Sequence, residues 1–151
     1  MMLIMRNKII TLISVIVLTG CQKFDIDVYN GPDTSLENLK GKWVVINYWA
    51  DWCPPCLKEM PELVNFANAN PDINVYAFNY DELEISELKP QLKKFSVDIP
   101  SIISHPRDIW GIKTPQTIPA TYFINTDGEL VLSLFKPQTE ETLTNQLRAV
   151  Q

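Results

Sequence analysis

Two cysteines with two residues between them, Cys53 and Cys56, form the segment Trp52-Cys53-Pro54-Pro55-Cys56. At this spacing the two sulfurs can close a disulfide on themselves. The reactive form of a cysteine is its thiolate, and a cysteine with the ordinary pKa near 8.5 is only about 3% ionised at pH 7. We therefore expect the neighbouring elements to stabilise a thiolate. The pair predicts a redox-active dithiol.

The residues on either side of the pair predict a strand followed by a helix. The nearly continuous apolar run 43–50 is typical of a strand covered on both faces. Apolar residues then recur at three- and four-residue spacing over 54–68, which predicts a helix with a kink at Pro61. Cys53 thus lies at the helix N-terminus, where unpaired N–H groups and the helix dipole favour negative charge. We expect Cys53 to be the nucleophile and Cys56 the resolving thiol.

The two prolines bear on the direction of electron transfer. Neither Pro54 nor Pro55 offers an N–H to the Cys53 sulfur or carries positive charge, which favours a more reducing couple. Two other uses of the cysteines are weaker. Zinc needs two further ligands, and after residue 21 only His105 and carboxylates are available. A purely structural disulfide across four residues constrains the unfolded chain little.

The rest of the pattern predicts a single α/β domain, for which 151 residues are enough. A helical crossover between the first two strands implies a parallel pair, and Thr126-Asp127-Gly128 predicts an antiparallel hairpin. The other expected elements are strands over 73–80, 120–125 and 129–135, helices over 86–95 and 140–150, a short apolar stretch over 99–103 and a helical turn over 108–112.

The first twenty residues predict export. Arg6 and Lys8 precede an apolar stretch, 9–18, that is too short to span a bilayer comfortably but suits a secretory signal. It ends at Leu18-Thr19-Gly20-Cys21, which resembles the bacterial lipobox. We expect Cys21 to carry lipid. A plain signal peptide or an uncleaved membrane anchor is the alternative.

These boundaries divide the chain into a lipoprotein signal peptide (1–20), a lipid-anchored tether with an N-terminal extension (21–35) and a folded domain (36–151). Removal of the signal leaves Cys53 and Cys56 as the only free thiols, outside the cytosolic systems that keep thiols reduced. The net charge of −5, without a basic cluster, argues against nucleic acid as a partner.

A longer segment around the dithiol, from Asn47 to Cys56 and on through Lys58-Glu59-Met60-Pro61, resembles the thioredoxin superfamily. More narrowly it is similar to the TlpA/ResA-type membrane-anchored thiol-disulfide oxidoreductases. Segments 117–124 and 127–131 agree, and the resemblance covers roughly 36–150. It implies a thioredoxin-like fold: a central mixed β-sheet flanked by helices, with an N-terminal extension and an inserted helix in the middle.

The resemblance also implies roles for single residues. Pro119 matches the cis-proline that faces the dithiol, and the backbone of Ile118 then pairs with an extended substrate; the alternative is a proline that merely opens a strand. Glu59 matches an acidic residue that exchanges a proton with Cys56, one helical turn away. An exposed, solvated carboxylate is the alternative for Glu59. Trp52, beside the nucleophile, is expected to be a partly exposed substrate contact.

Two departures from the family pattern stand out. Asn47 occupies the place of a buried aspartate in thioredoxins proper and cannot titrate. Extra residues around Thr114-Pro115-Gln116 are expected to lengthen the loop beside the active site. His105 is expected to be an exposed loop residue without a role.

Together these features predict an extracytoplasmic enzyme that reduces protein disulfides through Cys53 and Cys56. The resemblance implies a membrane reductant of the DsbD/CcdA type as electron donor and apocytochrome c as a substrate, in the periplasm or its equivalent. We expect a monomer with no cofactor and no metal site. The alternatives are a disulfide oxidase or isomerase, and a non-catalytic redox-sensing lipoprotein.

Overall fold

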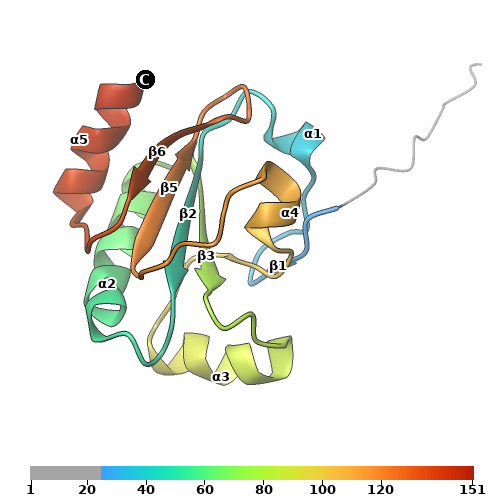
Figure 1. Cartoon of the computed structure of the whole chain (residues 1–151), viewed down its shortest axis with the longest axis vertical. Helices are drawn as coiled ribbons and strands as arrows, with labels where there is room; N and C mark the ends of the chain where they lie inside the picture. Colours follow the sequence, from blue (N-terminus) through green and yellow to red (C-terminus); the bar gives the residue numbers. More distant parts are fainter. Residues whose placement is uncertain (1–24) are drawn as a thin grey trace, which may run out of the picture.

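A six-stranded mixed sheet in the order β1-β4-β3-β2-β5-β6 forms the centre of the computed structural model, which describes residues 25–151 (Figure 1). The predicted signal peptide and Cys21 lie outside the described residues. Along the chain the elements are β1 (Val28–Tyr29), α1 (Leu36–Leu39), β2 (Val44–Trp49), α2 (Pro54–Ala69), β3 (Asn74–Asn79), α3 (Ile85–Lys94), β4 (Ser101–Ile102), α4 (Pro106–Trp110), β5 (Ala120–Ile124), β6 (Leu130–Leu134) and α5 (Glu140–Val150). The predicted thioredoxin-like fold is confirmed.

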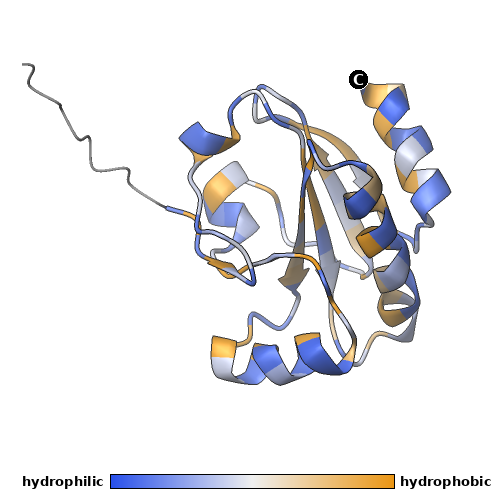
Figure 2. Ribbon diagram, turned by 180° about the vertical axis from the view of Figure 1, so that it is seen from behind, coloured by the Kyte–Doolittle hydropathy of each residue, from blue (hydrophilic) through white to orange (hydrophobic). Residues whose placement is uncertain are grey.

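The central strand β2 is buried along its whole length, as its continuous apolar sequence predicts. It pairs in parallel with β3 and antiparallel with β5. Its alternate residues enter two separate cores. Val45 and Trp49 pack with apolar residues of α2, α3 and α5, whereas Ile46 and Tyr48 face the core that includes Leu39 of α1 and residues next to α4. Figure 2 shows the hydrophobic residues of the central strands between these helical layers.

Helix α2 brings the cysteine pair to the end of β2. It starts at Pro54 and runs without interruption to Ala69, so Pro61, where we expected a kink, lies inside a continuous helix. Of the apolar residues in its predicted stripe, Met60 and Leu63 are fully buried, while Leu57, Val64 and Ala67 are partly buried against the same core. Phe66 is buried as well. The face next to the sheet therefore anchors the helix firmly and holds its N-terminus in place.

The N-terminal extension takes part in the sheet. Strand β1 pairs antiparallel with β4, and Ile26, which is fully buried, forms a bridge with Thr34. The Asp27 backbone makes two hydrogen bonds to the residues that follow β4. Its N–H donates to Ser104 Oγ at 2.8 Å, and its carbonyl accepts from the Ile103 N–H at 2.9 Å. The extension thus covers the edge of β4.

The C-terminal elements follow their sequence signals closely. Strands β5 and β6 form the predicted hairpin, in which Asn125 Oδ1 accepts from the Asp127 and Glu129 N–H groups and Gly128 adopts a positive φ of 81°. Helix α5 begins with a capping box between Thr139 and Thr142. Along residues 25–151, no helix is long and apolar enough to cross a membrane.

His105 departs from the expectation of an exposed loop residue, which is wrong. Its side chain is only 9% exposed. The reason is that it caps the short helix α4: Nδ1 accepts the Arg107 N–H at 2.9 Å, while Nε2 lies 3.1 Å from Glu82 Oε1. The ring also packs edge-on against Phe78.

Candidate active site

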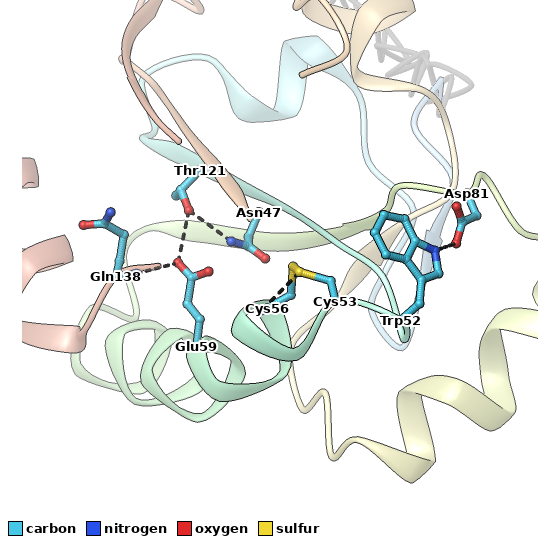
Figure 3. The surroundings of a disulfide bond; sticks show 8 residues. All are labelled: Asn47, Trp52, Cys53, Cys56, Glu59, Asp81, Thr121 and Gln138. Carbon is cyan, nitrogen blue, oxygen red and sulfur yellow. Dashed lines mark hydrogen bonds between the residues drawn. A yellow bond between two sulfur atoms is a disulfide. The ribbon is translucent and has the colours of Figure 1, made fainter. Parts of the chain in front are cut away.

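A disulfide joins Cys53 and Cys56 at the N-terminus of α2 (Figure 3). Cys53 is the N-cap of the helix, and its sulfur accepts the Cys56 N–H at 3.3 Å. Pro54 and Pro55, the first two helical residues, have no N–H to donate. The Cys56 N–H is therefore the first helical donor available to the Cys53 sulfur.

The two cysteines differ in their access to the surface. Cys56 is completely buried, whereas Cys53 retains 4% exposure. Both belong to the core cluster that α2 forms against β2. An approaching molecule therefore meets the disulfide from the Cys53 side.

Glu59 lies one turn beyond Cys56 and is buried, with 2% exposure, so the exposed alternative is wrong for this residue. Its Oε1 accepts the Gln138 N–H at 3.2 Å and the Thr121 hydroxyl at 3.5 Å. Burial raises the pKa of Glu59 from 4.5 to about 7, because contributions from Gln138, Asn47 and Thr121 lower it by less than desolvation raises it. This carboxyl is thus able to hold or release a proton near neutral pH.

Asn47 sits on β2 beside this carboxyl and is fully buried. Its Nδ2 donates to Thr121 Oγ1 at 3.0 Å, so the Thr121 hydroxyl connects Asn47 to Glu59. Among residues 25–151, neither Asn47 Oδ1 nor Glu59 Oε2 has a hydrogen-bond partner. In Figure 3 the free oxygen of Glu59 points towards Asn47 and the disulfide. The interior beneath Cys56 is therefore polar, and only part of its hydrogen-bonding capacity is used.

Sequence reasoning did not single out Thr121 or Gln138. Thr121 stands directly opposite Asn47 in the β2–β5 register, and Gln138 precedes the cap of α5. Thr121 falls within the segment 117–124 that carries the family resemblance, which is the one signal that pointed near it. Nothing in the sequence pattern marks Gln138, whose backbone rather than side chain makes the contact.

Trp52 is exposed over 58% of its surface, as expected, and its contact with substrate stays a prediction. Its Nε1 donates to Asp81 Oδ2 at 2.7 Å, and its ring packs edge-on against Tyr80 at 6.1 Å between centroids. Asp81 and Tyr80 follow β3 and were not predicted as site residues. They hold the indole of the residue before Cys53, and Figure 3 shows its hydrogen bond to Asp81.

The segment around Pro119 enters β5 at the same end of the sheet. The Ile118–Pro119 peptide bond is cis, as the resemblance implies, and Ile118 is partly buried against both cores. Ala120, the next residue, pairs with Tyr48 near the end of β2. The extra loop residues are anchored to this region, because the Tyr80 hydroxyl donates to the Pro115 carbonyl at 3.3 Å.

The arrangement suits two-electron exchange between a dithiol and a disulfide, with a carboxyl nearby that titrates close to pH 7. Within the part of the chain that the structure describes, no three His, Cys, Asp or Glu residues come together as metal ligands. The reactive groups that the described residues bring to this site are the two sulfurs of Cys53 and Cys56 and the carboxyl of Glu59.

Comparison with known proteins agrees with this geometry. Residues 19–133 match the AhpC/TSA family. The thiol-disulfide oxidoreductase ResA of Bacillus cereus is 30% identical over 129 residues, which cover 84% of this chain and 74% of that protein. The sporulation thiol-disulfide oxidoreductase A of Bacillus subtilis is 26% identical over 124 residues, which cover 80% of this chain and 74% of that protein.

Among solved structures, StoA from Bacillus subtilis superposes with a TM-score of 0.64 at 25% identity, over 80% of this chain and 96% of its own. The fold of StoA and the sequence relatives agree with the redox function that the cysteine pair predicts. The chain belongs to the thioredoxin-like AhpC/TSA family, and it is a thiol-disulfide oxidoreductase of the ResA type.

Proposed function

We propose that this protein reduces protein disulfides outside the bacterial cytoplasm, where lipid on Cys21 anchors it to a membrane. The observation that carries the proposal is the joint placement of two groups on α2. The disulfide lies at the helix N-terminus, and the buried carboxyl of Glu59, with a pKa raised to about 7, lies one turn further on.

In the proposed cycle the Cys53 thiolate attacks one sulfur of a substrate disulfide. A mixed disulfide forms and the first substrate thiolate leaves. The Glu59 carboxylate then takes the proton of Cys56, whose thiolate attacks the Cys53 sulfur and displaces the second substrate thiolate. The substrate has gained two electrons, and Cys53 and Cys56 are left as the disulfide. A membrane dithiol reductant of the DsbD/CcdA type returns the two electrons.

The reducing direction rests on how weakly the Cys53 thiolate is stabilised. The Cys56 N–H is the one donor recorded for the Cys53 sulfur among the described residues, because both residues between the cysteines are prolines. A strongly oxidising pair requires a reduced form with a well-stabilised thiolate. A single backbone donor at 3.3 Å stabilises the Cys53 thiolate only weakly, which favours a reducing pair.

We infer that the substrate lies across Trp52, Ile118 and Pro119. Trp52 is an exposed aromatic surface next to the nucleophile. The resemblance implies that the backbone of Ile118, before the cis-proline, pairs with an extended segment as a further strand would. Apocytochrome c, reduced before haem attachment, is the proposed substrate.

Reduction of insulin by the purified protein with a thiol donor tests the chemistry. We expect Cys53→Ser to abolish turnover and Cys56→Ser to accumulate a mixed disulfide that identifies the substrate. Turnover by Cys53→Ser would overturn the mechanism. A reduction potential near −120 mV, at the strongly oxidising end, would replace the reductase by an oxidase.

Anchoring has a separate test in cells. Cys21→Ser should abolish lipid labelling and release the protein from membranes. Retention of Cys21→Ser at the membrane with an unchanged N-terminus would instead identify an uncleaved anchor.

A further inference from the structure

A second feature at the dithiol end of the sheet has no place in the cycle above. A pocket of about 480 Å³ lies between the loop 113–117, Tyr122 of β5 and Phe135. Lys113 is the only charged residue in its lining. The loop contains the residues Thr114-Pro115-Gln116 by which this chain departs from the family pattern.

Two aromatic side chains, Tyr122 and Phe135, line the pocket. Phe135, directly after β6, is 56% exposed, and its ring meets Tyr122 edge-on with the centroids 6.0 Å apart. An exposed phenylalanine in a concave apolar site gains free energy when another apolar group covers it. The Tyr122 hydroxyl donates a hydrogen bond to the Lys113 carbonyl of the loop at 3.4 Å.

The loop is held in place from its other side as well. The Tyr80 hydroxyl donates to the Pro115 carbonyl, and Pro115 itself is buried. A preformed pocket loses less conformational entropy on binding than one that must be ordered by its ligand.

Two links connect the pocket to the segments around the dithiol. Tyr80, which holds Pro115, also packs against Trp52, the residue before Cys53. On the other side Thr117, in the pocket lining, leads directly into Ile118 and Pro119. An extended chain advances about 3.3 Å per residue, so a segment crossing Ile118 reaches the pocket within a few residues.

We propose that this pocket binds an apolar side chain, aromatic or large aliphatic, of the substrate segment that flanks the cysteine being reduced. The inference rests on the proposed function, since it assigns a specificity site to the same reaction. The occupant belongs to a disulfide-bearing polypeptide because Tyr80 and Thr117 connect the pocket to Trp52 and Ile118. It is an apolar side chain because two aromatic rings line the pocket.

The test compares two kinds of substrate with reduced protein. One is hydroxyethyl disulfide, which is too small to reach the pocket. The other is a set of disulfide-linked peptides that carry phenylalanine or serine at successive positions from two to five residues from the cysteine. We expect kcat/KM to be about tenfold higher for phenylalanine at one of these positions, which corresponds to partial burial of the ring.

Phe135→Ser should reduce that preference to less than about twofold and leave hydroxyethyl disulfide reduction unchanged; Phe135→Leu should retain part of it. Leu130→Ser is the matched control, since Leu130 is an exposed apolar residue at the other end of β6 and outside the pocket lining. It should keep the full preference.

Three results would overturn the inference: no preference in the unmodified protein, a preference that survives Phe135→Ser, or an equal loss on both kinds of substrate. Concentration-dependent dimers that Phe135→Ser dissociates would identify a second copy as the occupant and would also overturn it. Failure of the unmodified protein to reduce even hydroxyethyl disulfide would count instead against the proposed reductase function.

Discussion

The two sides of the disulfide differ in their relation to water. Beneath Cys56 lies an interior cluster of Asn47, Glu59, Thr121 and the Gln138 backbone, fully enclosed and with two oxygen atoms that lack partners within residues 25–151. Beside Cys53 lies a rim of Trp52, Tyr80 and Asp81, in which the exposed indole makes a 2.7 Å hydrogen bond. The group with the raised pKa belongs to the interior cluster.

This difference follows from the cost of burying charge. In the interior cluster desolvation outweighs three favourable contacts, so Glu59 holds its proton up to near neutral pH. At the rim water remains available, and a single hydrogen bond orients the indole of Trp52, the proposed substrate contact. The structure thus places the titratable carboxyl and the exposed indole on opposite sides of one sulfur pair, and the proposed function assigns proton transfer to the first and substrate contact to the second.

The largest effect that tests this separation is on stability. The folded oxidised protein keeps a proton on Glu59 that the unfolded chain loses between pH 4.5 and about 7. The free energy of unfolding should therefore fall as pH rises through this window, by about 3 kcal/mol in total. In urea denaturation of the oxidised protein, Glu59→Gln should remove this part of the pH dependence.

Glu62→Gln is the matched control, because Glu62 lies on the same helix and its Oε2 also accepts a backbone N–H, that of Glu140. Glu59→Gln and the unmodified protein should differ in slope across pH 4.5 to 7. Parallel curves for the two proteins would show that Glu59 is ionised in the folded state at pH 5 and would remove the contrast between the two sides.

A kinetic effect of Glu59→Gln comes next. Without the carboxylate, the proton of Cys56 has no acceptor in the interior cluster, so decay of the mixed disulfide should slow roughly 10²-fold at pH 7. Formation of the mixed disulfide by Cys53 should change far less. Single-turnover measurements from pH 5 to 9 separate the two steps. Equal slowing of both would mean that Glu59 acts on the whole site rather than on Cys56.

Most of the fold could be predicted because its signals are local. The cap at Thr139, the turn around Gly128 and the apolar run of β2 each lie within a few residues of the element they define. The extension was the exception. Ile26 and Val28 belong to the core, yet their surroundings in the sequence are polar, and only the position of β4 explains their burial.

The cysteines could be found from their spacing and Glu59 from the family resemblance, but the partners of these residues could not. Thr121 is 62 residues and Gln138 79 residues from Glu59, and Asp81 is 29 from Trp52. Such contacts depend on strand register and on the path of loops. The same limit left the exposure of Glu59 open, since the residues that cover it belong to β5 and to the segment before α5.

At the rim the expected effect is smaller. Asp81→Leu removes the acceptor of the Trp52 N–H, which should raise KM for insulin about fivefold with little change in kcat, the cost of one hydrogen bond of about 1 kcal/mol. Asp81→Asn keeps an acceptor oxygen and should stay within about twofold of the unmodified protein. A fall in kcat at constant KM would place Asp81 in the chemical step and would contradict the division of roles between the rim and the interior cluster.

The smallest effect concerns the Thr121 hydroxyl. Its hydrogen bond to Glu59 Oε1, at 3.5 Å, is long, so Thr121→Val should tighten proton binding by Glu59 only about threefold and move the midpoint of the pH–stability difference upward. The variant also leaves Asn47 Nδ2 without its acceptor, which lowers stability equally at all pH values. The midpoint of the pH–stability difference, and not the overall loss of stability, therefore measures the hydrogen bond between Thr121 and Glu59. An unchanged midpoint would mean that the hydroxyl serves Asn47 alone and that burial, against the Gln138 N–H and Asn47, sets the acidity of Glu59.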